Sequence, residues 1–450
     1  MNIAFDISPL ISASGSFGDK SGVYRYTYGL ISSLSSLLLR IDKKSKIFLF
    51  SFNRDLLTYP LNPDILQVLS ARNITFFKKV PKFKLDESGD FFTDSYVFKS
   101  IHTLVKNLFK LNMKSMYENY INNIRFKKYI KFLRNEFARL KINIIYHSET
   151  AFYPLQEYIN VMTIYDLTPI ISPEMHRDEN IDLQKRKLKF ASKYCQGIVC
   201  ISKSTKNDLL RNSNIWKNKK IIVAYPGLDQ VFANASKKPV DSNKLFRNLN
   251  LIIKSRNQKI QKNKYLLYYG TFEPRKNLIY LIKAFINLQN EREIPSNYKL
   301  ILIGGEGWGG VKGSINNYID EQFPIDKDKN IILLDYLSDK YVIEFIKNSY
   351  CVIYPSLYEG FGLPVLESMS LGKAVICSDN SSLPEVGNRS VLYVDASDYY
   401  DIKQKIKYLI NNPEIAKSMG LEGMEQSNKF RWEKTAIKVY KFLTELSNEY

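Results

Sequence analysis

One stretch of the sequence, Tyr350–Glu367, constrains the fold more than any other. It begins with a short apolar run, Tyr350–Pro355 (YCVIYP), which predicts a buried strand. It continues into PVLESMSLG, which predicts a helix that has Pro364 in its first position and stops at Gly372. The stretch therefore predicts a strand, a glycine-containing loop and a helix in direct succession.

The loop of this unit, YEGFG, combines glycines with a carboxylate. Gly360 and Gly362 leave backbone N–H groups open to close approach, and the helix N-terminus behind them favours an anion such as phosphate. Glu359 in the loop and Glu367 in the helix can face one ligand, with Phe361 as an apolar wall. Carboxylates bind sugar hydroxyls well as acceptors. Phosphate and hydroxyls together predict a nucleotide-sugar; the alternative is a surface loop before an ordinary amphipathic helix.

Strand and helix signals alternate along the chain in two blocks. At 450 residues the chain exceeds the roughly 250–300 residues at which single cores usually divide. We therefore expect two doubly wound α/β domains, with ligand loops at the carboxyl ends of parallel strands. The predicted domains are residues 1–235, with a basic helical insertion at about 86–141, and residues 236–430, followed by an amphipathic helix over 431–450.

Four candidate site residues fall where strands of the first block are expected to end: Gly22, His147, Tyr165 and Asp166. The carboxyl ends of parallel strands meet at one edge of a sheet, so these residues are candidates for a ligand site. For His147, a hydrogen-bonded structural histidine is an equal alternative.

A second loop with site chemistry, Gly270–Asn277 (GTFEPRKN), follows the first strand of the second block. Arg275 and Lys276 in this loop are placed to neutralise a diphosphate held by the YEGFG loop. The alternative is an ordinary charged pair on the surface.

A competing signal is Gly305–Gly310 (GEGWGG), which satisfies the GxGxxG pattern of dinucleotide sites. That pattern should open directly into a helix and be followed by an acidic residue at the end of a second strand. The sequence that follows, VKGSINNYID, does not predict this arrangement. We therefore expect a glycine loop near the nucleotide and rank an NAD-dependent oxidoreductase below the other interpretations.

The formal charge of +20 fits nucleic acid, an anionic membrane surface or a phosphorylated substrate. Between Lys99 and Lys141 basic residues far outnumber acidic ones, and apolar residues recur at helical spacing. This basic amphipathic pattern is typical of helices that rest on anionic lipid, although a solvated helical face in a basic protein is an equal alternative. No nucleic-acid-binding motif accompanies the charge, so we do not expect a nucleic-acid partner.

The remaining composition predicts a cytoplasmic protein. No apolar run reaches the roughly 18 residues of a membrane span, and the N-terminal stretch carries Asp6 where a signal peptide would be apolar. The four cysteines have no CxxC spacing, which favours reduced, buried thiols. With only three histidines, a zinc site or a Ser–His–Asp hydrolase is hard to assemble, and no metal is expected.

Taken together, these motifs resemble the retaining glycosyltransferase family 4, whose GT-B fold has two Rossmann-like domains facing each other across a cleft. The segments that carry the resemblance are GVYRY, VMTIYDL, ISKSTKNDL, VAYPGLD, GTFEPRKNL, YEGFGLPVLESMSLGKAVICSD, SSLPEVG and FRWEKTA. The resemblance covers nearly the whole chain, and the glutamates of YEGFGLPVLE are its most specific feature. It also implies that the last helix packs back on the N-terminal domain.

The resemblance implies roles for individual residues. Glu359 would contact the donor sugar, Glu367 the ribose, and Lys276 the diphosphate. The backbone around Phe361, Gly362 and Leu363 would contact the sugar and the diphosphate. Members of this family transfer a sugar with retention and without a metal, and are thought to use a donor phosphate oxygen as the base.

Two departures from the family pattern concern charge and acceptor contacts. Many members carry arginine directly after the strand-end glycine, where this chain has Thr271, so we expect Arg275 to share in charge neutralisation. Many also carry histidine where Tyr165 stands, on the acceptor side, and Asp166 is the candidate to supply the polar contact there.

The predicted function is a metal-independent hexosyltransferase that uses a nucleotide diphosphate sugar such as GDP-mannose. The resemblance favours mannose or rhamnose as the sugar and a growing, lipid-linked surface glycan as the acceptor, at the inner face of the cell membrane. The alternative is a noncatalytic GT-B module that binds nucleotide and recruits a partner enzyme to the membrane.

Overall fold

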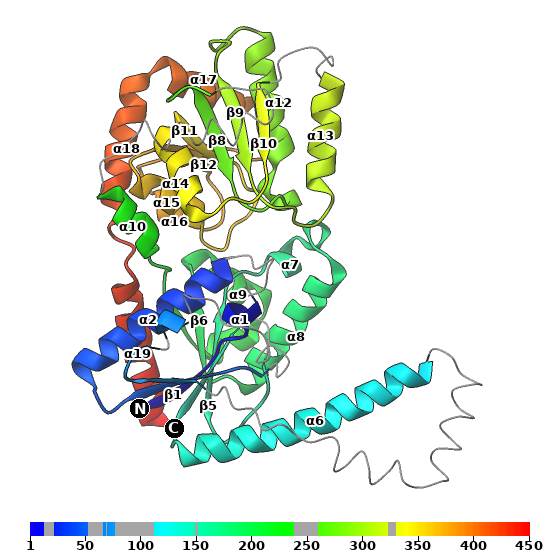
Figure 1. Cartoon of the computed structure of the whole chain (residues 1–450), viewed down its shortest axis with the longest axis vertical. Helices are drawn as coiled ribbons and strands as arrows, with labels where there is room; N and C mark the ends of the chain where they lie inside the picture. The colour runs from blue at the N-terminus through cyan, green and yellow to red at the C-terminus, as the bar shows by residue number, and fades with distance from the viewer. Residues whose placement is uncertain are drawn as a thin grey trace.

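The computed structural model describes residues 1–12, 22–52, 66–68, 70–76, 112–148, 152–237, 260–322 and 330–450, without the side chains of 12 and 112–125. Two parallel sheets organise these residues, one in each half of the chain (Figure 1). The expectation of two doubly wound α/β domains is confirmed.

The N-terminal sheet has seven strands in the order β3-β2-β1-β4-β5-β6-β7, and its pairings are parallel. The chain starts in the middle of this sheet, because β1 pairs with β2 on one side and with β4 on the other, so Ala4 lies between Phe48 and Ile145. The strands are β1 Asn2–Asp6, β2 Lys46–Phe50, β3 Ile74–Phe76, β4 Ile144–His147, β5 Ile159–Ile164, β6 Gly197–Cys200 and β7 Lys220–Val223.

The C-terminal sheet has six strands in the order β10-β9-β8-β11-β12-β13, again with parallel pairings. Its central strands are apolar throughout and fully buried, as expected for a parallel sheet covered on both faces. The strands are β8 Tyr265–Tyr269, β9 Lys299–Ile303, β10 Ile331–Leu334, β11 Cys351–Tyr354, β12 Ala374–Ser378 and β13 Leu392–Val394.

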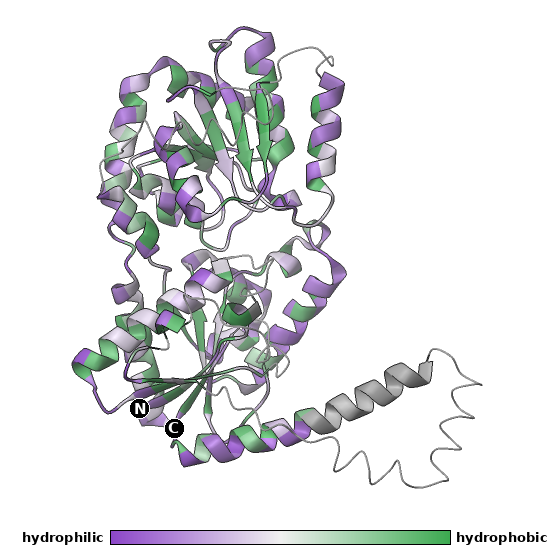
Figure 2. Ribbon diagram, viewed as in Figure 1, coloured by the Kyte–Doolittle hydropathy of each residue, from purple (hydrophilic) through white to green (hydrophobic). Residues whose placement is uncertain are grey.

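Helices cover both sheets, and their apolar faces form the core (Figure 2). In the N-terminal half they are α1 Ser8–Ser12, α2 Gly22–Ile41, α6 Asn112–Arg139, α7 Thr168–Ile171, α8 Asp178–Tyr194, α9 Lys203–Asn212 and α10 Gln230–Ser236, with 3₁₀ turns η2 Pro173–Met175 and η3 Asn214–Asn218. In the C-terminal half they are α12 Leu278–Asn290, α13 Val311–Gln322, α14 Asp339–Asn348, α15 Leu363–Ser370, α16 Leu383–Gly387, α17 Tyr399–Asn411 and α18 Pro413–Ser427, with the turn η4 Pro274–Lys276.

The last helix, α19 Trp432–Glu449, returns to the N-terminal domain and packs along α2 (Figure 1). Gly29 on α2 and Gly197 at the start of β6 allow α19 to approach closely. A Cβ at Gly29 would lie 2.2 Å from the Trp432 ring, and a Cβ at Gly197 would lie 2.6 Å from Leu446. The chain therefore crosses between the domains a second time after α18. Helix α19 follows the C-terminal domain in the sequence but packs on the N-terminal domain.

The described end of α6 differs from the predicted lipid-facing helix. Its apolar residues Tyr129, Ile130, Leu133 and Phe137 are buried in a core shared with β2, rather than presented to solvent. The apolar stripe over residues 126–139 therefore serves the domain's own core, which a sequence pattern cannot distinguish from a membrane-facing stripe. The exposed side of this end is basic and includes Lys127, Lys128, Lys131 and Arg134.

The rest of the predicted insertion, 86–111, lies outside the described residues, as do the side chains of 112–125. Within the described part of the chain, no helix combines the length and apolar character that a bilayer span requires. All four cysteines are buried and unpaired.

Candidate functional site

The predicted strand, loop and helix form as a unit in β11, the YEGFG loop and α15. Gly362 caps the helix with φ +100°, a left-handed conformation that L side chains rarely adopt. A Cβ there would also lie 2.6 Å from the Leu383 side chain. The helix begins at Leu363 with Pro364 in its first turn, where no backbone N–H is missed. The glycine and the proline together aim the helix N-terminus at the space between the domains.

That space is a cavity of about 770 Å³ lined by both domains. Strand ends of both sheets open into it, because Tyr269, Ile303 and Tyr354 end C-terminal strands and Tyr165 and Ile201 follow N-terminal ones. Eleven of the predicted site residues lie on its wall: Gly22, Tyr165, Asp166, Thr271, Arg275, Lys276, Glu359, Phe361, Gly362, Leu363 and Glu367. Residues that are up to 345 positions apart in the sequence therefore share one site.

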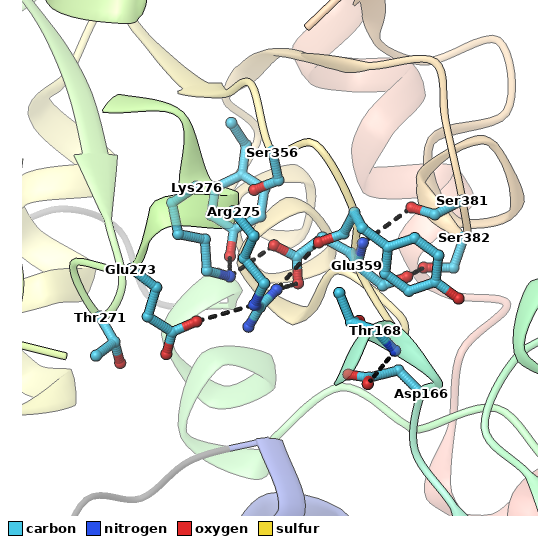
Figure 3. A network of polar contacts seen from close by, with 12 residues as sticks. Asp166, Thr168, Thr271, Glu273, Arg275, Lys276, Ser356, Glu359, Ser381 and Ser382 are labelled. Carbon is cyan, nitrogen blue, oxygen red and sulfur yellow. Dashed lines mark hydrogen bonds and ion pairs between the residues drawn. The ribbon is translucent and has the colours of Figure 1, made fainter. Parts of the chain in front are cut away.

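Glu359 is the centre of a buried ionic cluster on this wall (Figure 3). Lys276 Nζ lies 2.6 Å from Glu359 Oε1, and Arg275 Nη1 lies 2.9 Å from Glu359 Oε2. Lys276 also donates a hydrogen bond to the Tyr354 hydroxyl at 2.6 Å, and Arg275 Nε lies 2.9 Å from Glu273 Oε2. Two cations and two carboxylates thus balance each other beside the cavity.

The ionisation of this cluster follows from its contacts. Burial alone would raise the pKa of Glu359, but Arg275 and Lys276 outweigh burial and hold that pKa at about 2. Burial, followed by the charge of Arg275, lowers the pKa of Lys276. Burial also raises the pKa of Glu273, against the pull of Arg275. Glu359 is the ionised partner that both cations share.

The YEGFG loop also contacts two serines of its own domain and the backbone of the N-terminal domain. The Glu359 N–H donates to Ser381 Oγ at 3.0 Å, and Ser382 Oγ donates to the Glu359 carbonyl at 2.9 Å. On the opposite side, a Cβ at Gly360 would lie 2.6 Å from the carbonyl oxygen of Tyr165 in the N-terminal domain. Glycine at this position therefore allows the central loop to contact the other domain.

Glu367 belongs to a second ionic cluster, which sequence reasoning missed. Its Oε1 lies 3.1 Å from Nη1 of Arg25 on α2, and Arg25 also contacts Asp229 and Asp339. Burial raises the pKa of Glu367 to about 7; Arg25 opposes this effect, and the neighbouring aspartates add to it. Arg25 lies within GVYRY, but the motif did not show that this side chain would reach a carboxylate of the other domain.

Tyr165 and Asp166 lie at the end of β5, on the N-terminal side of the cavity. The Tyr165 hydroxyl is buried 3.2 Å from Thr27 Oγ1, and its ring packs edge-on against Tyr26. Asp166 Oδ1 accepts a hydrogen bond from the Thr168 N–H at 3.0 Å (Figure 3). Tyr165 is therefore mainly a packing residue of this wall, whereas Asp166 brings a carboxylate to it.

His147 does not lie on the cavity wall, so its prediction as a binding residue is not retained. It is fully buried, stacks on Phe52 at 5.4 Å between ring centroids and meets Phe190 edge-on at 4.9 Å. Its Nε2 is 2.8 Å from Asn160 Oδ1, and burial lowers its pKa to about 4. The strand end is where it was predicted, but the side chain points into the aromatic core.

The GEGWGG loop contributes Gly305 and Glu306 to the cavity wall and opens directly into α13 at Val311, contrary to the expectation from the sequence. Beyond the wall, Trp308 Nε1 donates to the Met175 carbonyl at 2.6 Å and its ring lies 5.4 Å from that of His176. The loop therefore makes a further contact between the two domains.

Among the described residues, no three histidine, cysteine, aspartate or glutamate side chains are placed together to hold a metal ion. The candidate groups for an anionic ligand are instead the cations Arg275 and Lys276 and the helix N-terminus at Gly362.

Comparison with known proteins gives consistent results. Residues 251–426 match the family model described as "Glycosyl transferases group 1". The chain is 28% identical over 302 residues to the O-antigen chain mannosyltransferase B of Escherichia coli, an alignment that covers 66% of this chain and 74% of that protein.

Solved structures share the whole fold at low identity. Sucrose-phosphate synthase from Thermosynechococcus elongatus superposes with a TM-score of 0.62 and 16% identity over 100% of both chains. The Anabaena protein HepE, solved in complex with UDP and glucose, superposes with a TM-score of 0.60 and 13% identity over 99% of this chain and 100% of that one. The architecture of two facing domains is the GT-B fold.

Proposed function

Because the chain carries a glycosyl transferase group 1 domain within a GT-B fold, we propose that it transfers a hexose from a nucleotide diphosphate sugar to a growing glycan. The observation that carries this proposal is the buried cluster of Glu359 with Arg275 and Lys276 on the wall of the cavity between the domains. A wall with a fixed carboxylate and two fixed cations suits a ligand that has both hydroxyls and a diphosphate.

In this proposal the two faces of the ligand meet different groups. Glu359 accepts hydrogen bonds from the donor sugar, and Glu367 accepts them from the ribose. The diphosphate lies at the N-terminus of α15, against the backbone of 361–363, where the helix dipole and the exposed N–H groups favour negative charge.

Charge on the leaving diphosphate must be stabilised as the glycosidic bond to the donor breaks. Arg275 and Lys276 supply that stabilisation without a metal ion in the proposed reaction, and Thr271 lies on the same wall. Asp166 is the candidate contact for the acceptor hydroxyl, from the N-terminal domain. The proposed transfer proceeds with retention, with a donor phosphate oxygen accepting the proton of the incoming hydroxyl.

We further propose GDP-mannose as the first donor to examine and a lipid-linked surface glycan as the acceptor. The similarity to an O-antigen chain mannosyltransferase supports the sugar and the glycan class. The HepE complex with UDP and glucose shows that this fold holds a nucleotide and a sugar, and it keeps UDP-sugars in the donor panel.

The test is a donor panel with the purified chain. Thermal shift against GDP, UDP and other nucleoside diphosphates identifies the base, since a ligand that binds the folded state raises apparent stability. Hydrolysis or transfer is then measured for the matching nucleotide-sugars, with and without a chelator. We expect turnover of one nucleotide-sugar that the chelator leaves unchanged.

The outcomes of this panel are distinct. Absence of both binding and turnover across the panel contradicts the proposed function. Binding of a nucleoside diphosphate without turnover of any sugar would instead favour a noncatalytic module that binds nucleotide and recruits a partner enzyme.

A peripheral membrane position is proposed from the basic exposed side of α6. Reversing the charges of Lys127, Lys128 and Lys131 should reduce binding to vesicles containing phosphatidylserine. The difference in binding between the variant and the wild type should become smaller as salt is added. These lysines are exposed, so the fold should be retained. Equal vesicle binding by the variant and the wild type would remove α6 from the membrane proposal.

A further inference from the structure

Arg25 joins the two domains at the edge of the cavity. It projects from α2 of the N-terminal domain, its side chain is 14% exposed, and its guanidinium lies over the Phe232 ring at 5.6 Å. Nη2 lies 2.7 Å from Asp339 Oδ1, and Nη1 lies 3.1 Å from Glu367 Oε1 and 3.4 Å from Asp229 Oδ2. One side chain of the first domain thus contacts three carboxylates.

The three carboxylates come from separate segments of the chain. Asp339 is the first residue of α14, and Glu367 lies in the middle of α15, both in the C-terminal domain. Asp229 caps α10, which follows the last strand of the N-terminal domain. A planar guanidinium has five N–H donors and can contact several carboxylates at once. A lysine ammonium is a compact point charge and cannot reproduce this geometry.

Glu367 is held from both domains as a result. Arg25 contacts Oε1, and the Tyr269 hydroxyl lies 3.1 Å from Oε2, so each carboxylate oxygen has a partner from a different domain. The side chain of Glu367 is only 4% exposed, yet it lines the cavity. Its orientation therefore depends on how the domains are placed relative to each other.

We infer that Arg25 is a positioning residue of the donor site: it ties the domains together in the closed arrangement and holds the Glu367 carboxylate toward the cavity for the hydroxyls of a ribose. The inference rests on the proposed function for the identity of the ligand. Recognition of ribose by Glu367 is, on this view, coupled to closure of the cleft. Opening the cleft separates Arg25 from Glu367 and releases the nucleotide.

The charged neighbours of Glu367 explain why its ionised form depends on Arg25. Burial favours the protonated carboxyl, and the negative charges of Asp339 and Asp229 act in the same direction. Arg25 opposes them, and the Tyr269 hydroxyl also contacts the carboxylate. Without Arg25, Glu367 would be protonated over a wider pH range and no longer drawn toward the N-terminal domain.

The first measurement compares ribose recognition in the wild type and in Arg25→Gln. Affinities for a ribonucleoside diphosphate and its 2′,3′-dideoxy analogue are measured by calorimetry. We expect the substitution to lower the affinity for the ribonucleotide by at least about tenfold and the affinity for the dideoxy analogue by less than about threefold. The reason is that only the ribonucleotide has ribose hydroxyls for Glu367 to bind. In a Glu367→Gln background the substitution should have no further effect on this ratio. Equal weakening of both ligands would overturn the inference.

The second measurement needs no ligand. Small-angle scattering of the free protein should show a larger radius of gyration for Arg25→Gln than for the wild type, and an unchanged radius would overturn the tie between domains. If the wild type binds no nucleoside diphosphate, the proposed function fails, while scattering still decides whether Arg25 closes the cleft.

A matched control separates positioning from loss of stability. Lys403 is a buried cation, 5% exposed, that contacts Glu291 and lies 3.1 Å from Glu293, all within the C-terminal domain. Lys403→Gln should lower the melting temperature without changing either the ribose ratio or the radius of gyration. Arg25→Lys keeps the charge and should recover part of the ribose ratio; no recovery relative to Arg25→Gln would contradict an electrostatic role.

Discussion

Replacing Glu359 by Gln would remove the charge on which the buried cations of the cleft depend. Glu359 is 6% exposed and contacts Lys276 and Arg275 at 2.6 and 2.9 Å. A carboxyl whose pKa falls from 4.5 to about 2 on folding contributes about 3 kcal/mol of stability, because one pKa unit corresponds to about 1.4 kcal/mol. This contribution is fully present above pH 4.5 and is lost as the pH falls through about 2, so at neutral pH the variant loses all of it.

The assay follows thermal unfolding and donor turnover at about pH 7.5. A loss of about 3 kcal/mol lowers the melting temperature by roughly 6–12 °C for a domain of 150–250 residues. Turnover should fall by at least about a hundredfold, since the proposed charged contact to the donor sugar is lost. A nucleoside diphosphate should recover part of the stability, because its charge compensates Lys276 and Arg275.

The control makes the same chemical change in an ion-pair cluster outside the cavity. Glu293 also contacts two cations, Lys403 and Lys407, but its side chain is 21% exposed and that of Lys407 is 35% exposed. Glu293→Gln should have a smaller effect on stability and none on turnover, since pairs that are partly open to solvent are screened by water. Losses of equal size in the two variants, or turnover by Glu359→Gln within about tenfold of the wild type, would refute the assigned role.

Three further substitutions test other parts of the site. Gly360→Ala should lower turnover by at least about tenfold, because its Cβ would lie 2.6 Å from the Tyr165 carbonyl across the domain boundary, whereas Gly313→Ala, with no atom within 4 Å of its Cβ, should not; similar rates in the two variants would contradict the steric argument. Glu367→Gln should raise the melting temperature of the free protein near pH 8 and not near pH 5, because a carboxyl whose pKa rises to about 7 on folding loses its contribution as the pH rises through that value; an equal gain at both pH values would be inconsistent with this. His147→Gln should leave turnover within about threefold of the wild type. The variant should also lose less stability than the wild type as the pH falls from 6.5 toward 4, measured by urea unfolding; the same pH dependence in both proteins would argue against a buried neutral histidine.

Features with a local cause were predictable from the sequence. The run of apolar residues, the glycines and Pro364 act within a few residues of one another, so the strand, loop and helix of the central unit follow from local chemistry alone. The same holds for the alternation of strands and helices, since parallel strands joined by helices allow few arrangements.

Features that depend on the direction of a side chain were not predictable. His147 stands at a strand end as expected, yet it points into the aromatic core formed with Phe52 and Phe190. The apolar stripe at the end of α6 has the spacing of a lipid-facing helix, but Tyr129 and Phe137 pack on the domain's own core. The period of a helix specifies that one face is apolar and leaves open what covers it.

The sequence by itself determined the class of the molecule: two α/β domains, with a glycine loop, a helix N-terminus suited to an anion and two carboxylates in the second. Only the tertiary structure showed that Arg275 and Lys276 are bound to Glu359, and that Arg25, 342 residues before Glu367, contacts its carboxylate from the other domain. The physical reason is that an ion pair depends on distance in space, and residues on facing domains become neighbours only after each sheet has folded and the two have docked.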